Sequence, residues 1–123
     1  MRSLCKKEGS TRMEQIEQIC VEMIAHVGVA RSGYIEAIRK AKEGDFAAAE
    51  ECMKSAKEEY LQGHEAHYEL IQKEARGEHV EVPLILVHAE DQMMSAEAFQ
   101  VIAEELIASY QRIQQLETGV LGK

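Results

Sequence analysis

Two interruptions in an otherwise continuous helical pattern constrain the fold of this chain most strongly. The first, Glu43-Gly44-Asp45, joins a glycine suited to the end of a helix to an aspartate suited to the N-cap of the next. The second runs from Gly77 to Pro83, the only proline among 123 residues. Proline is tolerated in the first turn of a helix, because its missing N–H needs no partner there. The sequence therefore predicts an all-α chain of three long helices.

The first predicted helix runs from Met13 to about Lys42 and has one apolar face. Its apolar residues recur at spacings of three and four, as in an amphipathic helix: Ile16, Ile19, Cys20, Met23, Ile24, Val27, Ala30, Tyr34, Ala37, Ile38 and Ala41. Gly28 and Gly33 lie within this pattern, where each costs up to about 1 kcal/mol relative to Ala. We therefore expect a close helix approach or a local bend at these glycines.

The second predicted helix, from Phe46 to about Ala75, is rich in good helix formers. Its expected buried face consists of Ala49, Cys52, Met53, Ala56, Tyr60, Leu61, Leu70 and Ile71. His64 and His67 lie three residues apart, a spacing that a metal pair could use. No cysteine or matching third ligand accompanies them, so we expect these histidines to be solvated or to lie at the edge of the core.

The third predicted helix, from Leu84 to about Leu116, carries two neighbouring apolar stripes. One consists of Ile85, Ala89, Gln92, Ala96, Phe99, Ala103, Leu106, Tyr110 and Ile113. The other consists of Leu84, Val87, Asp91, Met94, Ala98 and Val101. An antiparallel three-helix bundle can cover only part of so wide an apolar arc. The surplus predicts self-association through this helix.

Composition places this bundle in a single soluble domain. We expect one domain over residues 13–117, with a polar N-terminal tail at 1–12 and a short C-terminal tail at 118–123. The net charge of -8 argues against binding to nucleic acid or to an anionic membrane. The three cysteines are widely spaced and no signal peptide precedes them, which indicates reduced thiols in a cytoplasmic protein.

One cluster of polar residues on the third helix has the spacing of a reactive site. His88 lies three residues before Asp91 and four before Gln92, so all three share one side of a helix. An imidazole can accept and release a phosphoryl group or a proton near neutral pH. A carboxylate on an apolar stripe must be paired, protonated or bound to a cation. Spacing alone favours a simpler interpretation, in which His88 is an interface histidine and Asp91 sets the register between helices.

Three stretches of sequence nevertheless resemble one known family. Residues 87–95, VHAEDQMMS, are similar to the active-site helix of the lactose/cellobiose class of enzyme IIA of the bacterial sugar phosphotransferase system, whose pattern reads approximately HAQDHLMT. Residues 28–32 resemble its G-x-A-R-S motif, and residues 43–49 its G-D-F-x-x-A turn. The resemblance extends from about Met13 to Ile113 with all three motifs in order.

The resemblance implies a function for the residues that match. Members of this family are homotrimers of three-helix bundles, and their histidine accepts phosphate from the phosphocarrier HPr and passes it to a cysteine of enzyme IIB. His88 occupies that position. Asp91 matches the aspartate near the trimer axis, which can hold a structural divalent metal ion such as magnesium. The sugar, a disaccharide of the cellobiose or lactose type, meets only the membrane component, so contact with the membrane is indirect.

Two residues depart from the family pattern beside the histidine. Glu90 stands where the family commonly has Gln, and Gln92 where it commonly has His. Both are expected neighbours of the phosphate, although a carboxylate there would repel it and an amide could donate a hydrogen bond.

Two other interpretations remain open. The departures would suit a helical interaction or regulatory homologue that has lost the chemistry. A metal-storage bundle built on His26, His64, His67 and His79 is disfavoured, because these histidines do not share one helical face.

Overall fold

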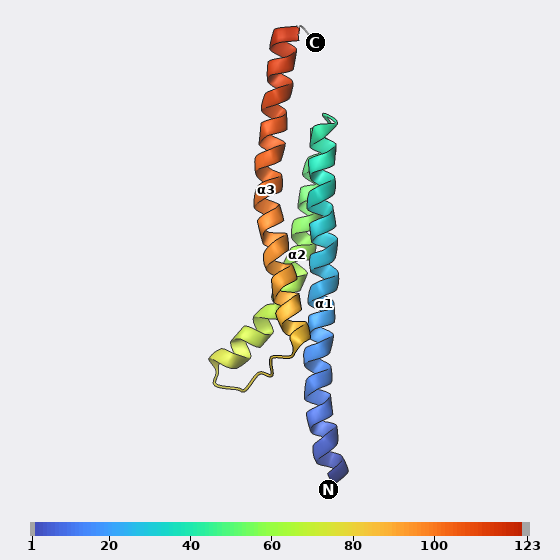
Figure 1. Cartoon of the computed structure of the whole chain (residues 1–123), viewed down its shortest axis with the longest axis vertical. Coiled ribbons are helices and arrows are strands. Elements are labelled where there is room, and N and C mark those ends of the chain that lie inside the picture. Colours follow the sequence, from blue (N-terminus) through green and yellow to red (C-terminus); the bar gives the residue numbers. More distant parts are fainter. Residues whose placement is uncertain (1, 122–123) are drawn as a thin grey trace.

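Three helices make up the structure. The computed structural model describes the backbone of residues 2–121 and the side chains of residues 12–120. The helices are α1, Arg2–Lys42; α2, Phe46–Ala75; and α3, Leu84–Leu121. Helices α1 and α3 run in one direction and α2 runs in the opposite direction beside them (Figure 1). The predicted all-α, antiparallel three-helix bundle is confirmed, as are the predicted starts of the second and third helices.

The outer helices extend beyond their predicted boundaries. The backbone of α1 is already helical at Arg2, and α3 continues to Leu121. Most of the two expected tails, residues 1–12 and 118–123, is therefore a continuation of these helices. No proline lies in either segment, so nothing there forces the helix to stop. Residues 1, 122 and 123 lie outside the described part of the chain.

The first predicted turn has the expected capping chemistry at both ends. Gly44 adopts a φ of 86°, and the N–H of Asp45 donates to the carbonyl of Lys40 at 2.9 Å. This pattern satisfies carbonyl groups that the end of α1 would otherwise leave unpaired. The Asp45 side chain accepts a hydrogen bond from the N–H of Ala48 at 3.1 Å and caps α2. The reversal is therefore fixed by the same three residues that predict it.

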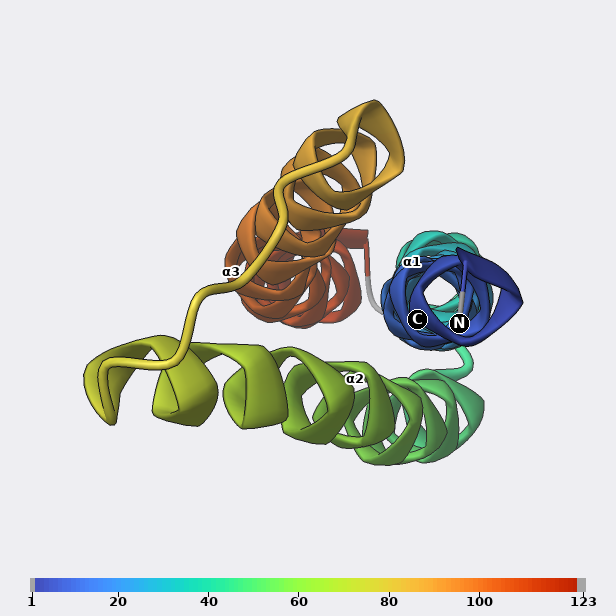
Figure 2. The same cartoon turned by 90° about the horizontal axis from the view of Figure 1, so that it is seen from below.

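The second connection is longer and lets α2 and α3 separate. Gly77 adopts a φ of 83°, and the N–H of Glu78 donates to the carbonyl of Lys73 at 3.0 Å, so α2 ends as α1 does. The carbonyl of Pro83 then accepts from the N–H of Leu86 at 3.0 Å at the start of α3. The last turns of α2 diverge from α3, and residues 76–83 bridge the gap between them (Figure 2).

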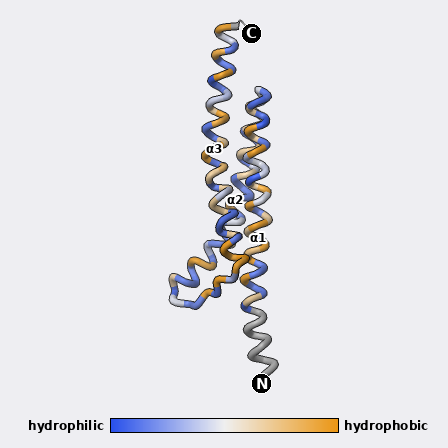
Figure 3. The backbone as a smooth tube through the Cα atoms, viewed as in Figure 1, coloured by the Kyte–Doolittle hydropathy of each residue, from blue (hydrophilic) through white to orange (hydrophobic). Residues whose placement is uncertain are grey.

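Two apolar clusters form the core along the bundle. The first consists of Ile16, Cys20, Met23, Val27, Leu70, Leu86, Ala89, Met93 and Ala96. The second consists of Ala30, Tyr34, Ala37, Met53, Ala56 and Ala103. Every buried residue of α1 among residues 12–42 belongs to its predicted apolar face. Hydrophobic residues recur along all three helices (Figure 3), and several outside these clusters, among them Val21, Val29 and Val101, are exposed.

The predicted buried face of α2 is partly wrong. Leu61 and Ile71 are exposed, whereas Gly63 is buried. The buried positions follow Met53, Ala56, Gly63 and Leu70. Ile71 is turned about 100° from Leu70 around the helix, and Leu61 lies on nearly the opposite side from Gly63. A glycine has no apolar side chain to reveal its position in a hydrophobic pattern, although here it lies against α1.

The predicted stripe of α3 also needs correction. Ala89, Ala96 and Ala103 are buried as predicted, but Leu106 and Ile113 are exposed. Ile113 lies beside Ala41 and Gly44 at the first turn, which covers it only partly, and α3 then extends past the end of α1 (Figure 1). Leu86 and Met93, which belong to neither predicted stripe, complete the buried line.

Candidate functional site

His88 lies in the second turn of α3, where its imidazole is accessible. The residue is exposed, and within residues 12–120 its side chain makes no hydrogen bond or ion pair. Because Pro83 immediately precedes α3 and accepts its first hydrogen bonds, and the core residues Leu86 and Ala89 fix the rotation of this helix, the position of His88 is set by rigid secondary structure. An imidazole without an internal partner has a ring nitrogen available to an incoming group.

Asp91 lies on an apolar surface that the chain leaves uncovered. The second predicted stripe, here called the outward stripe, consists of Leu84, Val87, Asp91, Met94, Ala98 and Val101, and every member is exposed. The Asp91 carboxylate has no hydrogen bond or ion pair within residues 12–120. The predicted surplus of apolar surface on α3 is therefore present, with one carboxylate in the middle of it.

The two expected phosphate neighbours lie on different sides of α3. Gln92 is half-buried and lies one helical turn from His88, on the same side. Glu90 is only two residues from His88, and residues at that spacing point to nearly opposite sides of a helix. Its Oε1 lies 2.9 Å from Nε2 of His67 on α2. A single chain therefore brings Gln92, but not Glu90, to the side of His88.

Glu90 belongs to a row of carboxylates that faces α2. The row consists of Glu90, Glu97 and Glu104, spaced seven residues apart, and we call it the carboxylate row. Glu104 lies 2.9 Å from the ammonium group of Lys57. Burial, and then the charge of Glu97 and a hydrogen bond to it, raise the pKa of Tyr60. Each carboxylate thus has a polar partner on α2.

His67 is the residue of this region that sequence reasoning missed. From the sequence it is only a possible metal partner of His64, whereas in the structure its hydrogen bond goes to Glu90 on α3. A signal existed, because Tyr60 and His67 repeat at the same spacing of seven as Glu97 and Glu90.

The charge of Glu90 also reaches α1. Burial, and then the charges of Glu90 and Glu17, raise the pKa of the Cys20 thiol in α1. The negative charge of Glu90 therefore affects the pKa of a buried thiol on the neighbouring helix.

The arginine of the G-x-A-R-S resemblance has a structural contact. The guanidinium carbon of Arg31 lies 4.8 Å from the centre of the Phe99 ring on α3. A cation over an aromatic face is attracted to it and shields the ring from water. This motif residue therefore joins α1 to α3, three turns away from His88 along the helix.

One chain does not supply a complete metal site. Within the described residues, no group of three or more His, Cys, Asp or Glu side chains could hold a metal ion. His64 stacks against Tyr68 at 6.4 Å between ring centres, and His26 bonds to Glu59 at 2.8 Å. Magnesium prefers about six oxygen ligands, so the Asp91 carboxylate of one chain fits such an ion only together with further copies or water.

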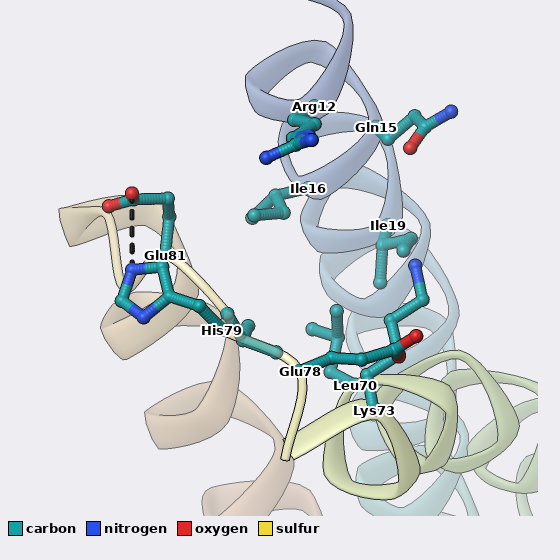
Figure 4. Close-up of a pocket in the computed structure, with 10 residues that line it drawn as sticks. Arg12, Gln15, Ile16, Ile19, Leu70, Lys73, Glu78, His79 and Glu81 are labelled. Atoms are coloured by element: carbon teal, nitrogen blue, oxygen red, sulfur yellow. Dashed lines mark hydrogen bonds and ion pairs between the residues drawn. The ribbon is translucent and has the colours of Figure 1, made fainter. Parts of the chain in front are cut away.

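A cleft of about 450 Å³ lies at the same end of the bundle but does not include His88. It is lined by residues of α1, the end of α2 and the connection that follows, among them Ile16, Leu70 and Lys73. His79 and Glu81, which bond to each other at 3.2 Å, form one of its walls (Figure 4). The His88 imidazole lies on the exposed surface of α3, where a group as large as another protein could reach it.

No helix in the described part of the chain is long and apolar enough to cross a membrane.

Comparisons with known proteins agree on one family. Residues 18–111 match the family described as PTS system, lactose/cellobiose specific IIA subunit. The chain is 42% identical over 100 residues to the lichenan-specific phosphotransferase enzyme IIA component of Bacillus subtilis (strain 168), an alignment that covers 81% of this chain and 91% of that relative. It is 34% identical over 99 residues to the cellobiose-specific EIIA component of Lactococcus lactis subsp. lactis (strain IL1403), covering 80% of this chain and 85% of the relative.

A solved structure extends the agreement to the fold. The crystal structure of the PTS cellobiose-specific enzyme IIA from Bacillus anthracis matches with a TM-score of 0.78 at 41% sequence identity, covering 80% of this chain and 91% of that one. The chain therefore belongs to the lactose/cellobiose-specific IIA family of the sugar phosphotransferase system.

Proposed function

We propose that this protein is a cytoplasmic phosphoryl carrier for the uptake of a disaccharide of the cellobiose or lactose type. In this proposal His88 accepts a phosphoryl group from phospho-HPr and passes it to a cysteine of the cognate enzyme IIB. The observation that carries the proposal is the exposed imidazole of His88, which has no hydrogen bond or ion pair within residues 12–120 and lies where the family resemblance expects the phosphate acceptor. Relatives named for lichenan and cellobiose support the class of sugar.

The transfer consists of two displacements at phosphorus. The lone pair of a neutral His88 ring nitrogen forms a bond to phosphorus while the bond to the donor on HPr breaks, and the donor leaves with that electron pair. A thiolate of enzyme IIB then attacks phosphorus, and His88 leaves as the neutral imidazole. The protein contributes mainly position, because α3 holds the acceptor rigidly at an accessible surface. Gln92, on the same side of α3, can donate a hydrogen bond to the transferred group.

Phosphate incorporation with a pair of histidine variants tests this proposal. Incubation with phospho-HPr should label the wild-type chain once, and His88→Ala should reduce the label to background. His79→Ala is the matched control, because this side chain is 81% exposed and should be dispensable. Full labelling of His88→Ala contradicts the proposal. A folded wild-type protein that takes up no acid-labile phosphate favours the alternative, a regulatory homologue that has lost the chemistry.

We further propose that three chains assemble through the outward stripe, with their Asp91 carboxylates near the axis and a divalent ion such as magnesium between them. Three like charges on an apolar interface repel one another, and a shared cation would relieve that repulsion. Sedimentation should show a trimer that is less stable in a chelator than in magnesium. Asp91→Asn should remove this difference, and a chelator effect that persists in the variant contradicts the role of Asp91.

A further inference from the structure

We infer that His67 is a positioning residue of the phosphoryl site: its hydrogen bond to Glu90 holds that carboxylate against α2 and away from the group transferred to His88. This inference rests on the proposed function. His67 Nε2 lies 2.9 Å from Glu90 Oε1 and joins α2 to α3 close to the turn of α3 that carries His88.

The position of Glu90 explains why it needs a partner. It lies between the α2 side of α3 and the outward stripe, and only two residues, about 3 Å of helix rise, separate it from His88. A phosphorylated imidazole carries negative charge, which a free carboxylate nearby repels. The flexible glutamate side chain could turn toward the outward stripe if nothing held it. Its hydrogen bond to His67 prevents this rotation.

No other described group takes the place of His67. Within residues 12–120, the bond to His67 is the only hydrogen bond or ion pair of Glu90. The α1 groups that share its electrostatic surroundings are the Cys20 thiol and the Glu17 carboxylate, and neither supplies positive charge. His67 itself is well placed, because its side chain is only 15% exposed and the packing of α2 fixes its direction.

A second histidine bond in the same chain provides a matched comparison. His26 Nδ1 lies 2.8 Å from Glu59 Oε2 and joins α1 to α2. Its length and chemistry resemble those of the His67 bond, but neither residue lies on α3. Loss of this bond removes an interhelical contact without releasing a carboxylate near His88.

The experiment measures the rate of phosphate transfer from phospho-HPr to five forms of the full chain: wild type, His67→Ala, His67→Gln, His67→Ala/Glu90→Gln and His26→Ala. We expect His67→Ala to be about fourfold slower at low ionic strength, given one unit charge at a distance on the order of 10 Å and an effective dielectric constant of about 40, and we expect this difference to shrink at physiological ionic strength. His67→Gln keeps a hydrogen-bond donor and should stay within about twofold of wild type. Removing the charge in His67→Ala/Glu90→Gln should restore the wild-type rate, and His26→Ala should leave it unchanged.

The outcomes separate this inference from the proposed function. Labelling of the wild-type chain at His88 tests the function, whereas the ratios between variants test His67. Recovery of the rate in the double variant supports the positioning role, because a general loss of folding would not be repaired by Glu90→Gln. A double variant as slow as His67→Ala, or a His67→Ala variant as fast as wild type, overturns the inference. Absence of any wild-type labelling overturns the function and this inference with it.

Discussion

The seam between α1 and α2 and the outward stripe of α3 are both built from small and apolar residues, but the chain closes only the seam. A Cβ atom at Gly33 would lie 2.8 Å from the Cβ of Ala56, so the two helices touch there almost backbone to backbone. On the outward stripe, Val87, Met94 and Val101 are each more than half exposed. The seam therefore completes the fold of one chain, while the stripe is available to another.

The largest expected effect comes from a charge on the outward stripe. Val101→Lys should convert the proposed trimer to a monomer that keeps its helical content, because three lysines would be desolvated at one interface. Sedimentation equilibrium and circular dichroism measure the two properties. Val29→Lys on α1 is the control, since Val29 and Val101 are the same residue type and both are 57% exposed. A Val101→Lys protein that remains trimeric would show that α3 does not form the interface in this way.

The closed seam should respond to a single methyl group. Gly33→Ala should lower the free energy of unfolding by about 1–2 kcal/mol, because the overlap with Ala56 outweighs the better helix propensity of alanine. Gly28→Ala has no atom within 4 Å of the new methyl group and should raise the free energy of unfolding by about 0.5–1 kcal/mol. Urea denaturation measures both. Changes of the same sign would contradict a seam that is close-packed at Gly33 and open at Gly28.

The smallest effect is expected where α3 is joined to α2 through charges. The hydrogen bond from Lys57 lowers the pKa of Glu104 below its ordinary value of 4.5, against the opposing effect of burial. Both side chains are about half exposed, so Lys57→Met should cost less than about 1 kcal/mol at neutral pH. Lys54→Met, at an exposed lysine without an ion pair in the described residues, is the control.

The pH dependence of this small effect has a definite sign. Because the pKa of Glu104 is lower in the folded chain, its stabilisation is present above the unfolded value and disappears as the pH falls through the folded value. The difference between wild type and Lys57→Met should therefore shrink in acid. A difference that grows as the pH falls from neutrality would exclude the pair as its cause.

The sequence predicts the helices well because their limits depend on local chemistry. Gly44, Asp45, Gly77 and Pro83 act within a few residues of themselves, and each has the predicted role at a turn or cap. The apolar face of α1 is predicted by its periodic spacing, and it is buried along its length because this helix packs against both of the others. The outer ends of α1 and α3 have no such signal. The helical backbone reaches Arg2 and Leu121, beyond the predicted limits at Met13 and about Leu116.

The tertiary details could not be predicted because they depend on how far helices separate. Leu61 and Leu106 are exposed since no other helix lies over them, which a periodic pattern cannot reveal. The bond from His67 to Glu90 likewise requires the register of α2 against α3. Spacing and resemblance predict His88 and Asp91 as site residues, but the separation of Glu90 from the His88 side becomes visible only in the structure.

The identity of the phosphorylated residue tests the proposed role of His88 most directly. After reaction with phospho-HPr, tryptic digestion without acid should yield residues 77–112 as one peptide, which contains both His79 and His88. Fragmentation of this peptide in a mass spectrometer distinguishes the two histidines. We predict one phosphate per chain, on His88. Phosphate on His79, or on a peptide outside residues 77–112, would contradict the assignment of His88 as the acceptor.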